Sequence, residues 1–432
     1  MTDQPERSAQ TAKTEQAAKT AKTAKQPQTR SMTLGYDPHL SEGAAFPTVF
    51  RTSTFLFKTA REGKRAFEIA YGLDAQKDGE CPALIYTRVN NPNVEMVEDR
   101  VTAWDGCEAA ALFASGMGAI AATCLAFLRP GDTLLFSNPV YGGSEALFRH
   151  MLPEFGIRTV EFPAACEREE LERIARAQQG VRMIFMESPA NPTIQLTDLA
   201  AGRAVADALS TPERPVLLAV DNTFMGPLFS HPRQHGADLV LYSATKFIGG
   251  HSDLVAGVSM GTRALIDRVK TIRTLFGANA DPQAAWLILR SLGTLEIRMR
   301  AQQQSALAIV EFLRAHPKVK RVAYPGLAEM GASQVARFER QCAGSGSLLS
   351  FEVQGGEAEA FRVLDAVREW KLAVSLGGIE SLIEHPATMT HSDMTPEEQA
   401  RAGITPAMIR LSVGLESLED LRADLAQALE RL

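Results

Sequence analysis

Lys246 is the residue whose position most clearly suggests chemistry. It comes just after the apolar run 239–242, and another apolar run, 216–220, is followed by Asp221. A lysine amine condenses readily with an aldehyde, and a carboxylate can keep a neighbouring ring nitrogen protonated. Taken singly, either residue is more typical of a solvated strand end or a turn. Because both come after strand-like runs, we expect them to meet at one edge of a sheet.

Pyridoxal phosphate is a cofactor that needs such a pair, together with donors for its phosphate and a flat group against its ring. The run Ser115-Gly116-Met117-Gly118 follows an apolar stretch and opens an apolar helix. Free N–H groups at a helix start suit a phosphate, although this pattern alone is also a common helix cap. Ser243 and Thr245 offer hydroxyl donors, and Tyr141 offers a ring for stacking. The sequence therefore predicts a pyridoxal phosphate site with Lys246 as its amine.

Strand-like and helix-like segments alternate over residues 100–260. Apolar runs typical of buried strands occupy 110–113, 133–136, 182–186, 216–220 and 239–242. Helix-compatible stretches lie between them, at 118–128, 144–151, 168–177 and 198–208. This alternation predicts an α/β fold, in which a mostly parallel sheet has helices on both faces. Ligands of such sheets bind at the carboxyl ends of the strands.

The pattern changes after about residue 290. One long helix is predicted over 293–315, and the segments 347–353 and 408–413 are strand-like. Ser417 and Asp420 have the spacing of a helix start, which predicts a last helix running to the C-terminus. These segments indicate a smaller α+β domain.

Four regions are expected along the chain. Residues 1–30 repeat small, polar and basic residues with little apolar content, which predicts a disordered basic tail. Acidic residues and the lack of an apolar stretch argue against a targeting peptide there. An N-terminal arm is expected at 31–90, a large cofactor-binding domain at 91–290 and the small C-terminal domain at 291–432.

The composition is that of a soluble globular protein, with 45% hydrophobic and 22% charged residues. A net charge of −6 gives no reason to expect nucleic acid or an anionic membrane as a partner. No apolar run approaches the roughly 20 residues that span a bilayer. The five cysteines are scattered and form no C-x-x-C pair, which fits a reducing cytoplasm.

Several motifs in the right order make the chain resemble the cystathionine γ-synthase and γ-lyase family of sulfur-amino-acid enzymes, which includes the methionine γ-lyases. The resemblance runs from about Leu34 to the C-terminus. It is carried by the segments 86–92 (YTRVNNP), 115–117 (SGM), 141–143 (YGG), 187–192 (ESPANP), 221–223 (DNT), 243–246 (SATK), 375–378 (SLGG) and 409–412 (IRLS). It implies a fold-type I pyridoxal-phosphate-dependent transferase fold with a smaller C-terminal domain.

The resemblance also implies individual roles at the cofactor. Lys246 would hold the cofactor and then move protons at the substrate α-carbon, and Asp221 would pair with the ring nitrogen. Tyr141 would stack on the ring and act as acid or base near the leaving group. The phosphate would be bound by Gly116, Met117, Ser243 and Thr245.

For the substrate, the resemblance implies a carboxylate clamp at Arg410, whose planar guanidinium suits a carboxylate. Asn191, which also lies at the cofactor, and the backbone near Ser375 would assist it. Tyr86 and Arg88 would reach the phosphate of the neighbouring subunit. The active unit would then be at least a homodimer, and usually a homotetramer built from two active dimers.

Two other motifs point to different chemistry. Ser243 and Lys246 also spell the S-x-x-K of serine β-lactamases, but the S-D-N and K-T-G tripeptides that these enzymes need do not occur in the sequence. His231 and His235 have the spacing of helical metal ligands. Pro232 disfavours a helix there and no further ligand is evident, so no metal site is expected.

Two positions bear on which reaction is catalysed. Family members that act on cystathionine often carry a glutamate where this chain has Val374, which cannot pair with a distal ammonium group. Val374 therefore favours a shorter or uncharged distal group, as in methionine γ-lyases. Those enzymes, however, typically carry a cysteine where this chain has Gly143.

The sequence thus predicts a pyridoxal-phosphate-dependent γ-elimination lyase. Its substrate would be an L-amino acid with a γ-leaving group, such as methionine, homocysteine or an analogue such as canavanine. The alternatives are γ-replacement, as in cystathionine γ-synthase or a homoserine-ester sulfhydrylase, and cystathionine γ-lyase activity. A pyridoxal-phosphate-binding protein without turnover is a further alternative.

Overall fold

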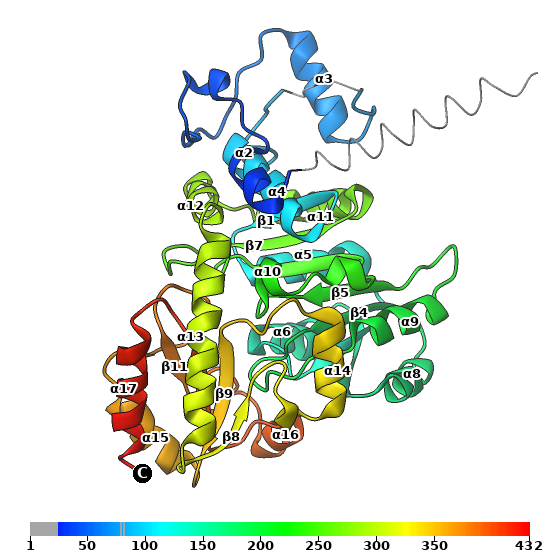
Figure 1. Ribbon diagram of the computed structural model, residues 1–432. Coiled ribbons are helices and arrows are strands. Elements are labelled where there is room, and N and C mark those ends of the chain that lie inside the picture. The colour runs from blue at the N-terminus through cyan, green and yellow to red at the C-terminus, as the bar shows by residue number, and fades with distance from the viewer. Residues whose placement is uncertain (1–24, 78–79, 81–82) are drawn as a thin grey trace, which may run out of the picture.

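Two sheets organise the computed structural model, which describes residues 25–77, 80 and 83–432. The larger sheet has seven strands in the order β1-β7-β6-β5-β4-β2-β3, and the smaller has five in the order β10-β11-β12-β9-β8. Figure 1 shows the two sheets in separate parts of the molecule, with the long helix α13 running beside the smaller one.

The large sheet contains the expected strands in a mostly parallel arrangement. Its strands are β1 (Ala109–Phe113), β2 (Thr133–Asn138), β3 (Arg158–Pro163), β4 (Val181–Glu187), β5 (Leu217–Asp221), β6 (Leu239–Ser243) and β7 (Gly257–Gly261). Strands β3, β2, β4, β5 and β6 are parallel, whereas β7 is antiparallel to both of its neighbours. The predicted α/β fold is confirmed.

The sequence analysis did not predict strands β3 and β7. β3 is the outer strand of the sheet and is mostly not buried, so it lacks the continuous apolar run of a core strand. β7 begins and ends in glycine, a residue depleted in strands, although it is fully buried. Both belong to the sheet through pairing that only the folded structure provides.

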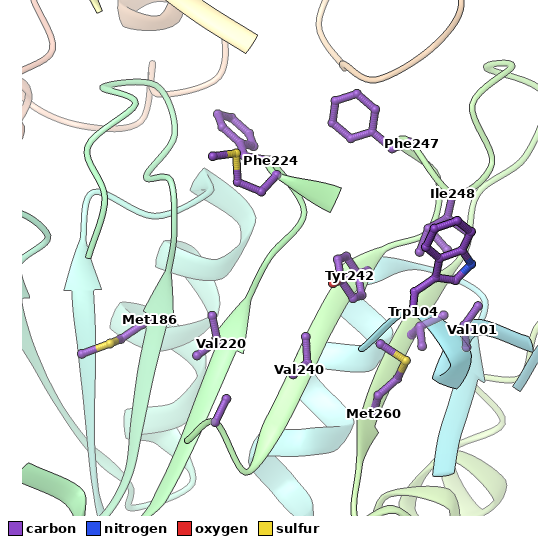
Figure 2. Close-up of a cluster of buried hydrophobic side chains, with 14 of the residues drawn as sticks. Val101, Trp104, Met186, Val220, Phe224, Val240, Tyr242, Phe247, Ile248 and Met260 are labelled. Atoms are coloured by element: carbon purple, nitrogen blue, oxygen red, sulfur yellow. The ribbon is translucent and has the colours of Figure 1, made fainter. Parts of the chain in front are cut away.

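Side chains alternate between the two faces of the large sheet, and each face has its own buried cluster. Leu135, Ile184 and Leu218 belong to one cluster, while their chain neighbours Leu134 and Leu217 belong to the other. Figure 2 shows part of the first cluster, where Val220 and Val240 project from adjacent strands. The surrounding helices are α4 (Pro92–Asp105), α5 (Gly116–Phe127), α6 (Gly142–Ala146), α7 (Leu152–Glu154), α8 (Arg168–Arg176), α9 (Leu199–Leu209), α10 (Gly226–Phe229), α11 (Arg263–Phe276) and α12 (Pro282–Leu292).

The smaller sheet lies in the C-terminal part of the chain and has a third buried cluster. Its strands are β8 (Val319–Ala323), β9 (Leu348–Val353), β10 (Lys371–Leu372), β11 (Leu382–Glu384) and β12 (Met408–Ser412). Its helices are α13 (Leu295–Ala315), α14 (Ala332–Gln341), α15 (Glu357–Ala366), α16 (Pro396–Ala402) and α17 (Leu418–Leu429). The smaller α+β unit expected from the sequence is therefore present. The Ser417 hydroxyl accepts from the N–H of Asp420 and caps the last helix.

The described N-terminal residues include the α-helices α2 (Pro27–Thr33) and α3 (Ala60–Ala70). The disordered tail was predicted to extend to about residue 30, whereas α2 begins at Pro27, because a proline is well tolerated in a first helical turn. Residues 1–24 lie outside the described part of the chain. Figure 1 shows α3 standing apart from both sheets. Among the described residues, no helix has the length and apolar character needed to cross a membrane.

Candidate active site

A cavity of about 600 Å³ opens where the central strands of the large sheet end. Glu187, Asp221 and Ser243 are the last residues of β4, β5 and β6, and Lys246 follows three residues after β6. The predicted site residues that line this cavity are Gly116, Met117, Tyr141, Asn191, Asp221, Ser243, Thr245, Lys246, Val374, Ser375 and Arg410. The cavity is thus formed by residues of both sheets and their connections.

Lys246 reaches across the cavity to the C-terminal part of the chain. Its Nζ donates to the Ser375 Oγ at 2.7 Å. Burial, together with the nearby positive charge of Arg410, lowers the pKa of Lys246 to about 8. The uncharged fraction of its amine near neutral pH is therefore larger than that of an ordinary lysine, and the uncharged amine is the form that attacks an aldehyde.

Asp221 is buried, and one of its carboxylate oxygens already accepts hydrogen bonds from within the protein. Its Oδ1 accepts from the Thr223 N–H at 3.0 Å and from the Thr223 Oγ1 at 2.6 Å. Oδ2 is left for a ligand, such as the protonated nitrogen of a pyridine ring. Burial raises the pKa of Asp221, so a positive partner is needed to keep it fully ionised.

The start of helix α5 has free backbone donors where the sequence predicts a phosphate site. The Ser115 hydroxyl accepts from the Gly118 N–H at 3.0 Å, while the N–H groups of Gly116 and Met117 precede the first helical acceptors. A side chain on Gly116 would come within 3.0 Å of the Ser243 Cβ, so only glycine allows this close approach. Backbone donors beside a hydroxyl, at the start of a twelve-residue helix, fit a phosphate dianion.

Thr245 departs in part from its predicted role. It lines the cavity, but its hydroxyl donates to the Ala256 carbonyl at 3.1 Å and accepts from the Ala256 N–H at 3.0 Å. Its hydroxyl proton is therefore already engaged, and the Ser243 hydroxyl is the freer donor of the two.

Tyr141 lies on the opposite wall, at the start of helix α6, with 47% of its surface exposed. Its ring lies directly over Gly143, where an added Cβ would be 2.7 Å from Tyr141 Cε1 and 3.1 Å from the Met117 sulfur. Any side chain at position 143 would have to displace one of these groups. Gly143 therefore determines where the Tyr141 ring lies.

Arg410, for which the family resemblance implies the role of carboxylate clamp, is bonded by three groups of the protein. Nη1 donates to the Asn191 Oδ1 at 2.9 Å and pairs with the Glu384 Oε1 at 2.7 Å, while Nη2 donates to the Ser375 carbonyl at 2.8 Å. Ser375 has a φ of 95°, a strained conformation for a residue other than glycine. This backbone turn lets the carbonyl of Ser375 face Arg410 while its hydroxyl faces Lys246.

Glu187 is a site residue that the sequence prediction did not assign. It is buried, lines the cavity, and accepts from the Tyr141 N–H at 2.8 Å through Oε2 and from the Asn191 N–H at 2.9 Å through Oε1. Burial and the neighbouring Asp221 raise the pKa of Glu187 to about 8. The Glu187 carboxyl group thus holds the backbone of both Tyr141 and Asn191 in place.

Glu384 is a second buried acid that the sequence prediction did not assign. It is paired in register with Arg410 across β11 and β12, and both side chains are almost fully buried. Burial raises the pKa of the Glu384 carboxyl, while Arg410 opposes this shift. A carboxylate at the end of a short strand gives no sequence signal by itself, because its partner lies 26 residues away.

Tyr86 and Arg88 do not line the Lys246 cavity of the same chain. They line another cavity, of about 440 Å³, with residues of the 277–282 segment. Both side chains are exposed, and Arg88 donates to the Thr274 carbonyl at 2.8 Å. Their predicted role at a neighbouring subunit's phosphate remains a prediction.

The α/β sheet, the lysine after β6, the aspartate at the end of β5 and the anion cradle at α5 are the features of fold-type I pyridoxal-phosphate-dependent enzymes. Comparison with known proteins defines the family more closely. Residues 28–430 match the sequence model described as "Cys/Met metabolism PLP-dependent enzyme". The chain belongs to this family, and it is a pyridoxal-phosphate-dependent enzyme of amino-acid metabolism.

Characterised relatives catalyse several reactions. The chain is 40% identical over 406 residues to the L-methionine gamma-lyase of Pseudomonas deceptionensis, covering 94% of this chain and 97% of that one. It is 38% identical over 391 residues to the O-succinylhomoserine sulfhydrylase of Pseudomonas aeruginosa, covering 90% and 92%. The crystal structure of cystathionine gamma synthase from Xanthomonas oryzae pv. oryzae, in complex with aminoacrylate and cysteine, matches with a TM-score of 0.84 and 35% identity, covering 95% and 99%.

Proposed function

We propose that this protein is a γ-elimination lyase for an L-amino acid with a γ-leaving group of the methionine or homocysteine type. The observation that carries the proposal is the pairing of a complete lysine, aspartate and arginine site with an apolar Val374 at the cavity wall. The L-methionine gamma-lyase relatives at about 40% identity support it.

Bound pyridoxal phosphate supplies an aldehyde for amines and a conjugated ring that accepts electrons from the substrate α-carbon. Lys246 would hold this aldehyde when the cofactor is bound, and its amine would serve as the base at the substrate α-carbon. Its lowered pKa suits both tasks, because an amine with a pKa of about 8 accepts and returns protons near neutral pH. Asp221 stabilises the positive charge on the ring nitrogen.

The remaining residues orient the substrate and assist departure of the leaving group. Arg410 and Asn191 bind the α-carboxylate, which positions the α-proton toward Lys246. Tyr141 stacks on the ring and gives or takes a proton at the leaving group. Glu187 holds the backbone of Tyr141 and Asn191 in the geometry that these tasks need.

Two further proposals concern the assembly of the protein and its location in the cell. We propose a homotetramer of two active dimers, in which Tyr86 and Arg88 of each subunit complete the phosphate site of the adjacent subunit. Their placement in a cavity apart from Lys246 supports this arrangement. We propose a cytoplasmic location, since the scattered cysteines suit a reducing compartment.

A substrate panel tests the proposed function. The purified enzyme is given methionine, homocysteine, canavanine and cystathionine singly, and O-acylhomoserine together with cysteine. We expect α-ketobutyrate and ammonia as the main products, formed from a substrate with a γ-leaving group. Cystathionine synthesis from O-acylhomoserine and cysteine as the dominant activity would replace the lyase with a γ-replacement enzyme.

γ-Replacement is the second candidate. The sulfhydrylase relative and the match to a cystathionine gamma synthase favour it. The two activities share the residues around Lys246, so the panel must measure both products in the same reaction.

A further inference from the structure

Of the charged residues that line the active-site cavity, Asp393 is the one whose side chain is exposed. The other charged residues in the cavity wall are Lys246, which is bonded to Ser375, and the buried Glu187, Asp221 and Arg410. Asp393 lies in the loop between β11 and α16, and it forms no hydrogen bond or ion pair with any described residue. It is thus available to a ligand.

The loop that carries Asp393 forms the cavity wall next to Tyr141. An added Cβ at Gly142 would lie 2.7 Å from the Thr390 carbonyl oxygen, so the backbone of this loop lies directly against the start of helix α6. Asp393 lines the same cavity as Lys246 and Arg410, so a substrate bound between these two residues can extend its distal end toward Asp393.

A second cavity, of about 470 Å³, lies behind Asp393 and shares Asp393 and Ala146 with the active site. It is predominantly acidic. Its charged lining comprises four carboxylates and one guanidinium, together with a histidine: Glu145, Glu161, Asp393, Glu398, Arg149 and His150. The excess negative charge extends from the second cavity to the leaving-group end of the active site.

Glu145 provides a separate indication of a cationic ligand in this region. It lines the second cavity, and only 5% of its surface is exposed. Its Oε1 accepts from Arg149 Nε at 2.7 Å, whereas its buried Oε2 has no partner among the described residues. A buried carboxylate oxygen without a hydrogen-bond partner is costly, and the ion pair with Arg149 leaves this oxygen able to accept from a further donor, such as an ammonium or a guanidinium.

We propose that the distal part of the active site selects substrates whose γ-leaving group ends in a cation, an ammonium or a guanidinium, through Asp393 with Glu145 behind it. This inference rests on the proposed γ-elimination and deepens it by naming the substrate class. Val374 taken alone favours an uncharged distal group, because it offers no charge partner at its own position. Asp393 lines the same cavity and supplies a negative charge there, so the inference replaces the uncharged distal group of methionine by a cationic one.

Two matched substrates test the inference. S-(2-aminoethyl)-L-homocysteine and S-propyl-L-homocysteine have side chains of the same length, and they differ by an ammonium in place of a methyl group. With water, each is converted to α-ketobutyrate, ammonia and the thiol. We expect kcat/KM to be about fivefold higher for the ammonium substrate, the upper end for an exposed ion pair. The ratio should fall as salt is raised, because salt screens exposed charges.

Asp393→Asn removes the charge but keeps the shape, and we expect it to reduce the ratio to below about twofold, mainly through KM of the ammonium substrate. Asp393→Lys should reverse the preference. Glu397→Gln is the matched control, because Glu397 is an exposed acid of α16 that lines neither cavity. This control should keep the wild-type ratio.

Failure of the inference and failure of the proposed function give different results. If both substrates yield α-ketobutyrate with equal kcat/KM, or if Asp393→Asn leaves the ratio unchanged, the selection by charge is wrong while the lyase remains. If neither these substrates nor methionine yields α-ketobutyrate, the γ-elimination itself is wrong, and the inference is overturned with it.

Discussion

Glu187 and Asp221 face each other in register on the parallel strands β4 and β5, with both side chains buried. Two neighbouring buried carboxyl groups rarely ionise together, so the pair shares a proton near neutral pH. A protonated ring nitrogen beside Asp221 favours the ionised form of Asp221. The shared proton then belongs to Glu187, whose pKa burial and Asp221 raise to about 8.

We expect the stability of the cofactor-free protein to depend on pH through Glu187. Since the folded pKa of Glu187 lies above its ordinary value of 4.5, the folded state binds more protons than the unfolded state between pH 4.5 and about 8. Glu187 therefore costs stability as pH rises through this window. Glu187→Gln, which does not ionise, should gain stability relative to wild type between pH 5 and 8, by at most ~1.4 kcal/mol per pH unit.

Thermal unfolding of the two proteins at several pH values measures this difference. Glu169→Gln, which changes an exposed acid of α8, is the control and should show a constant difference from wild type. A difference for Glu187→Gln that is also constant with pH would mean that Glu187 is ionised in the folded protein throughout.

Lys246→Ala should abolish covalent attachment of the cofactor and reduce turnover by at least about 10²-fold, since both the amine and the α-carbon base are lost. Lys246→Arg keeps a positive charge and serves as the control for charge alone. Borohydride reduction followed by mass spectrometry measures attachment separately from activity. Wild-type-like turnover in Lys246→Ala would remove the catalytic role of this lysine.

Arg410→Met should abolish substrate binding and also destabilise the fold. The substitution leaves Glu384 buried without its ion partner, and breaking a buried pair in this way costs about 3–5 kcal/mol. Adding Glu384→Gln should recover a large part of the stability but none of the activity. Chemical denaturation and KM together check this expectation; a double variant as unstable as Arg410→Met would show that the cost does not come from the unpaired Glu384.

Mixed oligomers test the proposed role of Arg88 across subunits. Arg88→Ala and Lys246→Ala should each be nearly inactive alone, because each lacks one part of every site. Unfolding and refolding the two variants together should restore about a quarter of wild-type activity, since half of the sites in each mixed dimer combine intact residues. Activity that stays at the level of the separate variants would place Arg88 outside the adjacent site.

The residues at strand ends were predictable, whereas those that support them were not. Lys246 and Asp221 follow apolar runs, and parallel strands end at the same edge, so their meeting follows from local pattern and sheet topology. Glu187 also ends a strand, but its partners are backbone N–H groups of Tyr141 and Asn191, and a backbone donor has no sequence signature. Arg410 was assigned only through the family resemblance, because its clamp depends on residues from distant segments.

The Lys246–Ser375 bond joins an amine from the large sheet to a strained residue from the C-terminal part of the chain. The distance between Lys246 and Arg410 therefore depends on how the two sheets pack, at residues of a shared buried cluster such as Phe229 and Leu348, which do not line the cavity. Substitutions in this cluster can change which amino acids the enzyme accepts, while every residue of the cavity wall stays the same. Directed evolution of substrate preference can therefore target positions that lie outside the cavity.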